Sequence, residues 1–331
     1  MKKKILGAML VAGMLGLGAC GDGEVKMVES ESFAETEVSV ERADVSVAES
    51  VAETESLSIT ETELDQVDTY EAFLKNEALM YEHFVEGATD GDVGYSLSAI
   101  MDRFKETYYG MQDAPVVEYA YIDCGNDGVT ELAVRFTGMG IYAPEDDSSV
   151  IYVIKEIDGQ LELCYSYETW ARSETRLNQH GYVTSGGSNG ASNYGFSAGY
   201  IDGAGKWNYL YYMEEEADIN QLTMNEQLKN LPVVAANKSY DGVIYVATTT
   251  FEEMVSQEAY LNTERFYAYY VDGAEGDVYT DSVYKEIFDE AGVKFYLPEE
   301  IDSMILEKEL SLGITEEIKN APDISWEKLS E

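Results

Sequence analysis

The sequence predicts an α+β fold in which N-terminal helices precede a large antiparallel sheet, a meander, with flanking and C-terminal helices. Apolar residues recur at helical spacing after residue 69 and again after residue 281. The stretch between them alternates in polarity and is rich in aromatic and β-branched residues, which is typical of strands. Asp158-Gly159 and the stretch 201–207 have the composition of tight turns that join antiparallel strands.

The chain begins with a predicted signal peptide, residues 1–19, in which three lysines precede the apolar run Ile5–Ala19. That run is shorter than the roughly 20 residues a transmembrane helix needs, and no later segment is apolar enough to span. Leu17-Gly18-Ala19-Cys20 resembles the lipobox of bacterial lipoproteins. The resemblance implies a diacylglycerol on Cys20 and an anchor in the cell membrane, since two acyl chains hold a protein stably there. The alternative is an ordinary cleaved signal.

Residues 20–68 are predicted to form an acidic, disordered linker behind the lipid anchor. The segment consists mostly of Glu, Ser, Thr, Ala and Val, with few basic and few large apolar side chains. Such a composition buries too little apolar surface to offset the entropy lost on ordering. Repulsion between its carboxylates should extend it and carry the folded part away from the membrane.

The folded part is expected to span residues 69–331. The spacing of Tyr70, Phe73, Tyr81 and Phe84 predicts a first helix, and a second is predicted over 96–110. Strands are predicted over 116–123, 131–137, 149–157, 160–168, 181–184, 193–201, 206–213, 243–249 and 265–271. Further helices are predicted over 220–229, 281–292 and 298–310. The part from about residue 221 can form a C-terminal subdomain, although no linker marks its start.

The charge of the chain excludes one class of partner. It has 64 acidic and 21 basic residues and a formal net charge of -43. Phosphate backbones would be repelled at ordinary salt, so we expect no nucleic-acid partner. The same excess makes chance pairs of carboxylates common, so no single acid can be nominated as catalytic from the sequence.

An acidic turn between two predicted strands is the most informative local motif. Residues 123–132 resemble the calcium loops of integrin-like propeller repeats and related bacterial surface proteins. The resemblance implies calcium ligands at Asp123, Asp127 and Glu131 and at the Val129 carbonyl. Gly125 departs from the pattern because it offers no side-chain oxygen. A weak calcium site and a turn that only connects two strands therefore both stay open.

Residues 118–192 as a whole resemble uncharacterised lipoproteins and secreted proteins of anaerobic Gram-positive bacteria. The resembling residues are YAYIDCGNDGVTELAVRF, YVIKEIDGQLELCYSYETWARSETRLNQHGYV and SGGSNGAS. The resemblance implies an exported domain with helices before the acidic turn and an antiparallel sheet after it. It implies no activity.

No nucleophilic constellation is predicted. Residues 186–190 fit the G-x-S-x-G pattern of hydrolases, but a predicted strand follows Ser188 where a helix is required. His83 and His180 are the only histidines, and both precede that serine. We expect a loop between strands here. Cys124 and Cys164 are expected to be buried thiols, with a disulfide as the alternative.

Aromatic residues suggest a binding function. The chain has 26 Tyr, clustered at 108–109, 209–212 and 267–270, and Trp170 lies close to Arg172 and Arg176. Aromatic faces stack on sugars, and two arginines four residues apart share a face if the segment is helical. We therefore expect Trp170, Arg172 and Arg176 to contribute to a ligand site. The alternatives are tyrosines that fill half-buried sheet faces and arginines that pair with surface acids.

The sequence thus predicts a lipid-anchored extracytoplasmic protein that is a binding or interaction module for a cell-wall or host glycan, or for a protein. One alternative is a structural or accessory lipoprotein of the envelope. Another is a glycan hydrolase that uses two carboxylates, which would need a cleft with paired acids.

Overall fold

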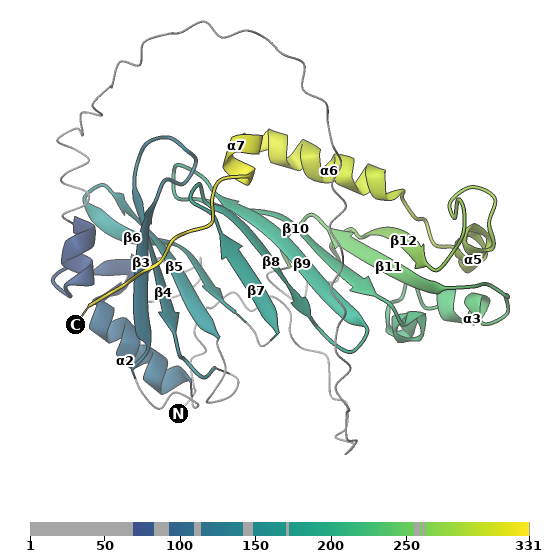
Figure 1. The fold of residues 1–331 in the computed structure, drawn as a ribbon, viewed down its shortest axis with the longest axis horizontal. Helices are drawn as coiled ribbons and strands as arrows, with labels where there is room; N and C mark the ends of the chain where they lie inside the picture. The colour runs from purple at the N-terminus through teal and green to yellow at the C-terminus, as the bar shows by residue number, and fades with distance from the viewer. Residues whose placement is uncertain are drawn as a thin grey trace, which may run out of the picture.

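The fold consists of two sheets, with helices on the outer face of the first sheet and on both faces of the second (Figure 1). The computed structural model describes residues 69–82, 93–108, 114–141, 148–169, 172–254, 259 and 262–330. The predicted signal peptide, Cys20 and the predicted linker lie outside the described residues. No helix within the described part of the chain has the length and apolar character to cross a membrane.

The first sheet has seven strands in the order β13-β3-β4-β5-β6-β1-β2. Its neighbours are antiparallel except for β1 and β6, which are parallel. The strands are β1 (Met80–Glu82), β2 (Val93–Tyr95), β3 (Val116–Ile122), β4 (Glu131–Thr137), β5 (Ser149–Ile157), β6 (Gln160–Glu168) and β13 (Glu327–Lys328). The predicted hairpin between β5 and β6 is present, with Asp158 and Gly159 both at positive φ, as a two-residue turn of type I′ requires.

The second sheet is a six-stranded antiparallel meander in the order β12-β11-β10-β9-β8-β7. The strands are β7 (Ser173–Leu177), β8 (Tyr182–Ser188), β9 (Asn193–Ile201), β10 (Trp207–Glu216), β11 (Val243–Thr250) and β12 (Phe266–Asp272). The loop between β9 and β10 is closed by the Asp202 carboxylate, which accepts hydrogen bonds from the backbone of Ala204 and Lys206. This loop reaches the first sheet.

The helices lie on the faces and ends of the sheets. They are a short helical stretch over 69–74, α2 (Leu97–Thr107), the 3-10 helix η1 (Ile219–Met224), α3 (Leu231–Ala235), α5 (Val283–Ala291), α6 (Pro298–Ser311) and α7 (Glu316–Lys319). Ser96 caps α2 and Ser282 caps α5 through their side chains, and Gly292 ends α5 in the left-handed conformation.

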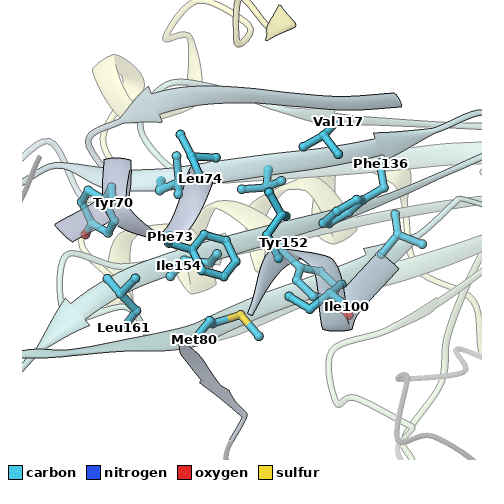
Figure 2. Close-up of a cluster of buried hydrophobic side chains, with 14 of the residues drawn as sticks. Tyr70, Phe73, Leu74, Met80, Ile100, Val117, Phe136, Tyr152, Ile154 and Leu161 are labelled. Carbon is cyan, nitrogen blue, oxygen red and sulfur yellow. The ribbon is translucent and has the colours of Figure 1, made fainter. Parts of the chain in front are cut away.

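One hydrophobic core lies between the N-terminal helical segments and the outer face of the seven-stranded sheet. Figure 2 labels residues from both layers, with Phe73 and Ile100 facing Phe136, Tyr152 and Ile154. All five side chains are almost fully buried. This core covers one face of the first sheet and leaves the other face for the second sheet.

A second core joins the two sheets. Ile122, Val153 and Tyr165 of the first sheet pack with Val183 and Ile201 of the second. Farther along the same face of the second sheet, Tyr269 and other apolar residues pack on α3 and α5. The opposite face of the second sheet is partly covered by α6 and α7, because Ile301 contacts Ala247 and Ala268 while Ile318 joins Tyr182 and Tyr200.

The predicted α+β class is confirmed, with more strand than helix. The prediction of one large sheet was wrong in detail, because the strands divide into two packed sheets. The predicted first helix is also too long, since it ends before Asn76, which adopts positive φ and accepts a hydrogen bond from the Ser98 amide. Residues 80–82 form a strand instead.

Candidate functional site

The acidic turn between β3 and β4 is held by its own carboxylates. Asp123 Oδ1 accepts hydrogen bonds from the amides of Asp127 at 2.9 Å and Gly128 at 3.2 Å. Asp127 Oδ1 accepts from the Val129 amide at 2.9 Å. These bonds satisfy backbone donors that the tight turn would otherwise leave unpaired. Both aspartates therefore have a structural task here.

Glu131 lies at the start of β4 with a fully buried side chain. One carboxylate oxygen accepts a hydrogen bond from the Cys124 amide at 2.7 Å, and the other forms an ion pair with Lys155 on β5. Burial raises the pKa of Glu131 to about 7, although Lys155 and the Cys124 amide both act in the opposite direction. The carboxylate belongs to a buried polar cluster and is committed to partners within the protein.

Of the four expected calcium ligands, the turn brings Asp123, Asp127 and Val129 together, whereas Glu131 points to Lys155. Among the described residues, no group of three or more His, Cys, Asp or Glu side chains is placed to hold a metal ion. Calcium would have to compete with the hydrogen bonds that now occupy these carboxylates. Calcium binding at this turn stays a prediction.

The acidic turn packs closely against the loop between β9 and β10. A Cβ on Gly125 would lie 2.6 Å from the Gly203 nitrogen, and a Cβ on Gly203 would clash with the Asp127 carboxylate, so both loops need glycine at this contact. The Gly125 amide also donates to the His180 carbonyl at 3.1 Å, and a ring nitrogen of His180 lies 3.1 Å from the Asp123 carbonyl. The turn therefore joins the two sheets at one end.

Cys124 and Cys164 are free thiols next to this junction, and a disulfide between them is absent. Burial raises the pKa of the Cys164 thiol to about 12 and that of Cys124 well above its usual value. Both groups are thus protonated near neutral pH and are poor nucleophiles.

The segment that carries Arg172 and Arg176 is not helical. Trp170 lies outside the described residues. Arg172 is exposed and has positive φ, and Arg176 lies on edge strand β7, where it pairs with Glu174 at 3.0 Å. The helical arrangement in which both arginines share a face was therefore wrong, because this segment becomes a strand that pairs with β8.

The Gly/Ser-rich segment around Ser188 connects strands, as predicted. Ser188 is the last residue of β8, its hydroxyl donates to the Gly190 carbonyl at 2.7 Å, and strand β9 follows. This backbone is not the strand-to-helix turn of a hydrolase nucleophile.

A hollow of about 290 Å³ lies between α6 and the six-stranded sheet. It is lined by Tyr182, Tyr211, Asp302, Ile305, Leu306, Glu309 and Lys319, and we call it the α6 hollow. Its floor is a polar triad. The buried Glu309 carboxylate accepts a hydrogen bond from the Tyr182 hydroxyl at 2.8 Å and pairs with Lys319 at 2.7 Å. Burial and this carboxylate raise the pKa of Tyr182.

Beside the α6 hollow, the sheet face that carries α6 is open. Strand register places Phe196 next to Met213 and Tyr194 next to Glu215, on the side that packs on α6. Phe196 is 39% exposed and Tyr194 is 47% exposed, so both residues are accessible to solvent. We call this surface the open strip. Arg176 lies on the same face. It pairs with Thr184 of β8, and Thr184 pairs with Ala198 of β9, which is two residues from Phe196.

No family model, curated protein or solved structure matches the chain. The resemblance to exported lipoproteins therefore stays a prediction.

The α6 hollow was missed from the sequence. Tyr211 belongs to the conspicuous cluster at 209–212, which was the available signal. Asp302 and Glu309 occupy one side of a single helix, but their opposite wall comes from β8 and β10, far away in the chain. Only the fold brings these walls together.

Proposed function

We propose that this protein is a glycan-binding module and that its ligand lies in the α6 hollow and on the open strip. The observation that carries the proposal is the exposure of Tyr194 and Phe196 on a sheet face beside a hollow lined with polar groups. Binding sites for small molecules and sugars combine such apolar surfaces with a few convergent polar groups. The predicted signal, lipid anchor and acidic linker would display the module outside the cytoplasm.

The polar groups of the hollow suit hydroxyl-rich ligands. Within the described residues, neither the Tyr211 hydroxyl nor the Asp302 carboxylate has a hydrogen-bond partner, yet both line the hollow. Burial and the nearby carboxylates raise the pKa of Tyr211, so its hydroxyl stays protonated and can donate or accept. A sugar hydroxyl would satisfy these groups.

Binding has more support than hydrolysis. A glycan hydrolase of the usual kind needs one carboxylic acid and one carboxylate free to act on the scissile bond. Asp302 and Glu309 both line the hollow, but the two oxygens of Glu309 are held by Tyr182 and Lys319. Glu309 therefore supports the wall of the hollow in this proposal.

Isothermal titration calorimetry of the full chain against soluble cell-wall and host glycans tests the proposal. Phe196→Ala and Tyr211→Phe remove one stacking ring and one hydroxyl. Tyr121→Ala is the matched control, because Tyr121 is also 39% exposed but lies on β3 of the other sheet.

Phe196→Ala should weaken binding about ten-fold or more, since an aromatic stack is worth roughly 1 kcal/mol beyond the area it buries. The Tyr121→Ala protein should bind like the parent. Equal losses in both variants would contradict the proposed site, and no heat with any glycan would contradict glycan binding and favour an accessory envelope protein.

A further inference from the structure

The open strip extends beyond Phe196 and Tyr194 to a second aromatic pair. Tyr245 of β11 and Tyr270 of β12 are register partners, and their rings stack with centroids 5.1 Å apart and an interplanar angle of 8°. Ala247 and Ala268, two residues along each strand, contact α6. Because side chains two residues apart point to the same face, this tyrosine pair shares the face of the open strip.

The extended surface is long enough for a chain ligand. At about 3.3 Å per residue, the tyrosine pair lies roughly 20 Å along the strands from Tyr211. Glu215 lies between the two ends, next to Tyr194 across the β9–β10 pair and next to Ala247 across the β10–β11 pair. Aromatic rings therefore flank a carboxylate in the middle of the strip.

The charge on this surface is negative. Arg176 pairs with Glu174, and Lys319 pairs with Glu309, so each of these cations is neutralised. Within the described residues, Glu215 and Asp302 have no ion-pair partner. Burial and the nearby Glu215 carboxylate raise the pKa of Tyr270.

We infer that the ligand is a chain glycan with free amino groups, which runs from the α6 hollow to the Tyr245–Tyr270 pair. This inference rests on the proposed glycan-binding function. Protonated amines complement Glu215 and Asp302, and they are attracted to the faces of aromatic rings. A neutral glycan would gain the stacking contacts but would leave both carboxylates without a cation.

The test compares glycans of one backbone whose amino groups are either free and charged or acetylated and neutral. The full chain is titrated with glucosamine oligosaccharides and with N-acetylglucosamine oligosaccharides of equal length, and with the glucosamine monomer, at low and high salt. Glu215→Gln and Asp302→Asn remove the proposed charge contacts. Glu226→Gln is the control, because Glu226 is a highly exposed acid near η1, outside the extended surface.

The amine-bearing oligomer should bind about ten-fold more tightly than its acetylated counterpart at low salt, and the advantage should shrink at high salt. It should also bind more tightly than the monomer. Glu215→Gln should remove most of the difference, with unchanged thermal unfolding, while Glu226→Gln should have no effect.

Equal binding of the two oligomers, or an advantage that Glu215→Gln and Glu226→Gln reduce alike, would overturn the inference and leave glycan binding in place. Binding of the monomer as tight as that of the oligomer would overturn the extended site. Absence of binding to these and all other glycans would remove the proposed function as well.

Discussion

The Glu131 carboxylate and the Lys155 ammonium group form a buried ion pair between adjacent strands β4 and β5, under the loop that joins β9 to β10. A Cβ on Gly205 of that loop would contact both Lys155 and the Cys164 sulfur. The pair thus lies where the two sheets meet at one end.

Glu131→Gln should destabilise the protein at pH 8, because it leaves the Lys155 ammonium buried without a counter-charge. Loss of one partner of a buried pair costs about 3 kcal/mol or more. The amide oxygen of Gln can still accept from the Cys124 amide, so the double variant with Lys155→Met should recover much of the loss. Urea unfolding measures both; a double variant as unstable as the sum of the single variants would contradict the prediction.

The stability of the protein should fall as pH rises toward 7. The pKa of Glu131 has its ordinary value of about 4.5 in the unfolded chain and is raised to about 7 in the folded protein, because burial disfavours the charged form. The stability that Glu131 contributes is fully present below its unfolded-state pKa and is lost as pH rises through its folded-state pKa. Between these two pKa values the free energy of unfolding should fall by roughly 1.4 kcal/mol per pH unit. Urea unfolding between pH 4 and 9 should show this slope reduced in Glu131→Gln. An identical pH profile in the variant would assign the slope to other groups.

Gly125→Ala should destabilise far more than Gly128→Ala. Both glycines have positive φ, which costs a non-glycine residue about 1 kcal/mol. A Cβ on Gly128 meets nothing within 4 Å, whereas one on Gly125 meets the Gly203 backbone at 2.6 Å, and such overpacking adds roughly 1–3 kcal/mol. Thermal unfolding of the two variants separates the cost of the backbone conformation from the cost of the clash between the loops. Equal melting temperatures would mean that the two loops do not touch.

Cys124 and Cys164 should resist alkylation in the native protein at pH 8. Burial raises the pKa of both thiols, which removes the reactive thiolate and blocks access to it. Mass spectrometry after iodoacetamide treatment should find both modified only after denaturation. Rapid native labelling of either residue would show that the junction opens.

Asp123→Ala should lower stability by about 1–2 kcal/mol, because the amides of Asp127 and Gly128 lose their acceptor. The loss is measured by thermal unfolding in EDTA and in millimolar calcium, and an equal loss in both would assign Asp123 to the turn alone. A calcium-dependent rise in melting temperature that Asp127→Ala abolishes would instead establish the turn as a calcium site.

Local sequence signals predicted most of the individual elements. Ser96 and Ser282 mark the starts of α2 and α5, and Asp158-Gly159 marks the hairpin between β5 and β6. Strand β7 was not predicted, because its polar residues 173–176 carry no apolar alternation, and it becomes a strand only by pairing with β8. The first helix was predicted too long because the left-handed turn at Asn76 has no local signature as strong as the apolar spacing around it.

The sequence by itself predicted most strands of the strand-rich middle, and it led to the expectations that nucleic acid is not a partner and that the chain is exported and lipid-anchored, because these depend on local composition and spacing. Only the tertiary structure decided that the strands divide into two sheets, that Glu131 faces Lys155, and that Tyr211 meets Asp302 across the α6 hollow. The physical reason is that these contacts join residues distant in the chain. Their geometry depends on which faces are buried against each other. The alternation of polar and apolar residues identifies the buried face of a strand, but it does not identify the element that covers that face.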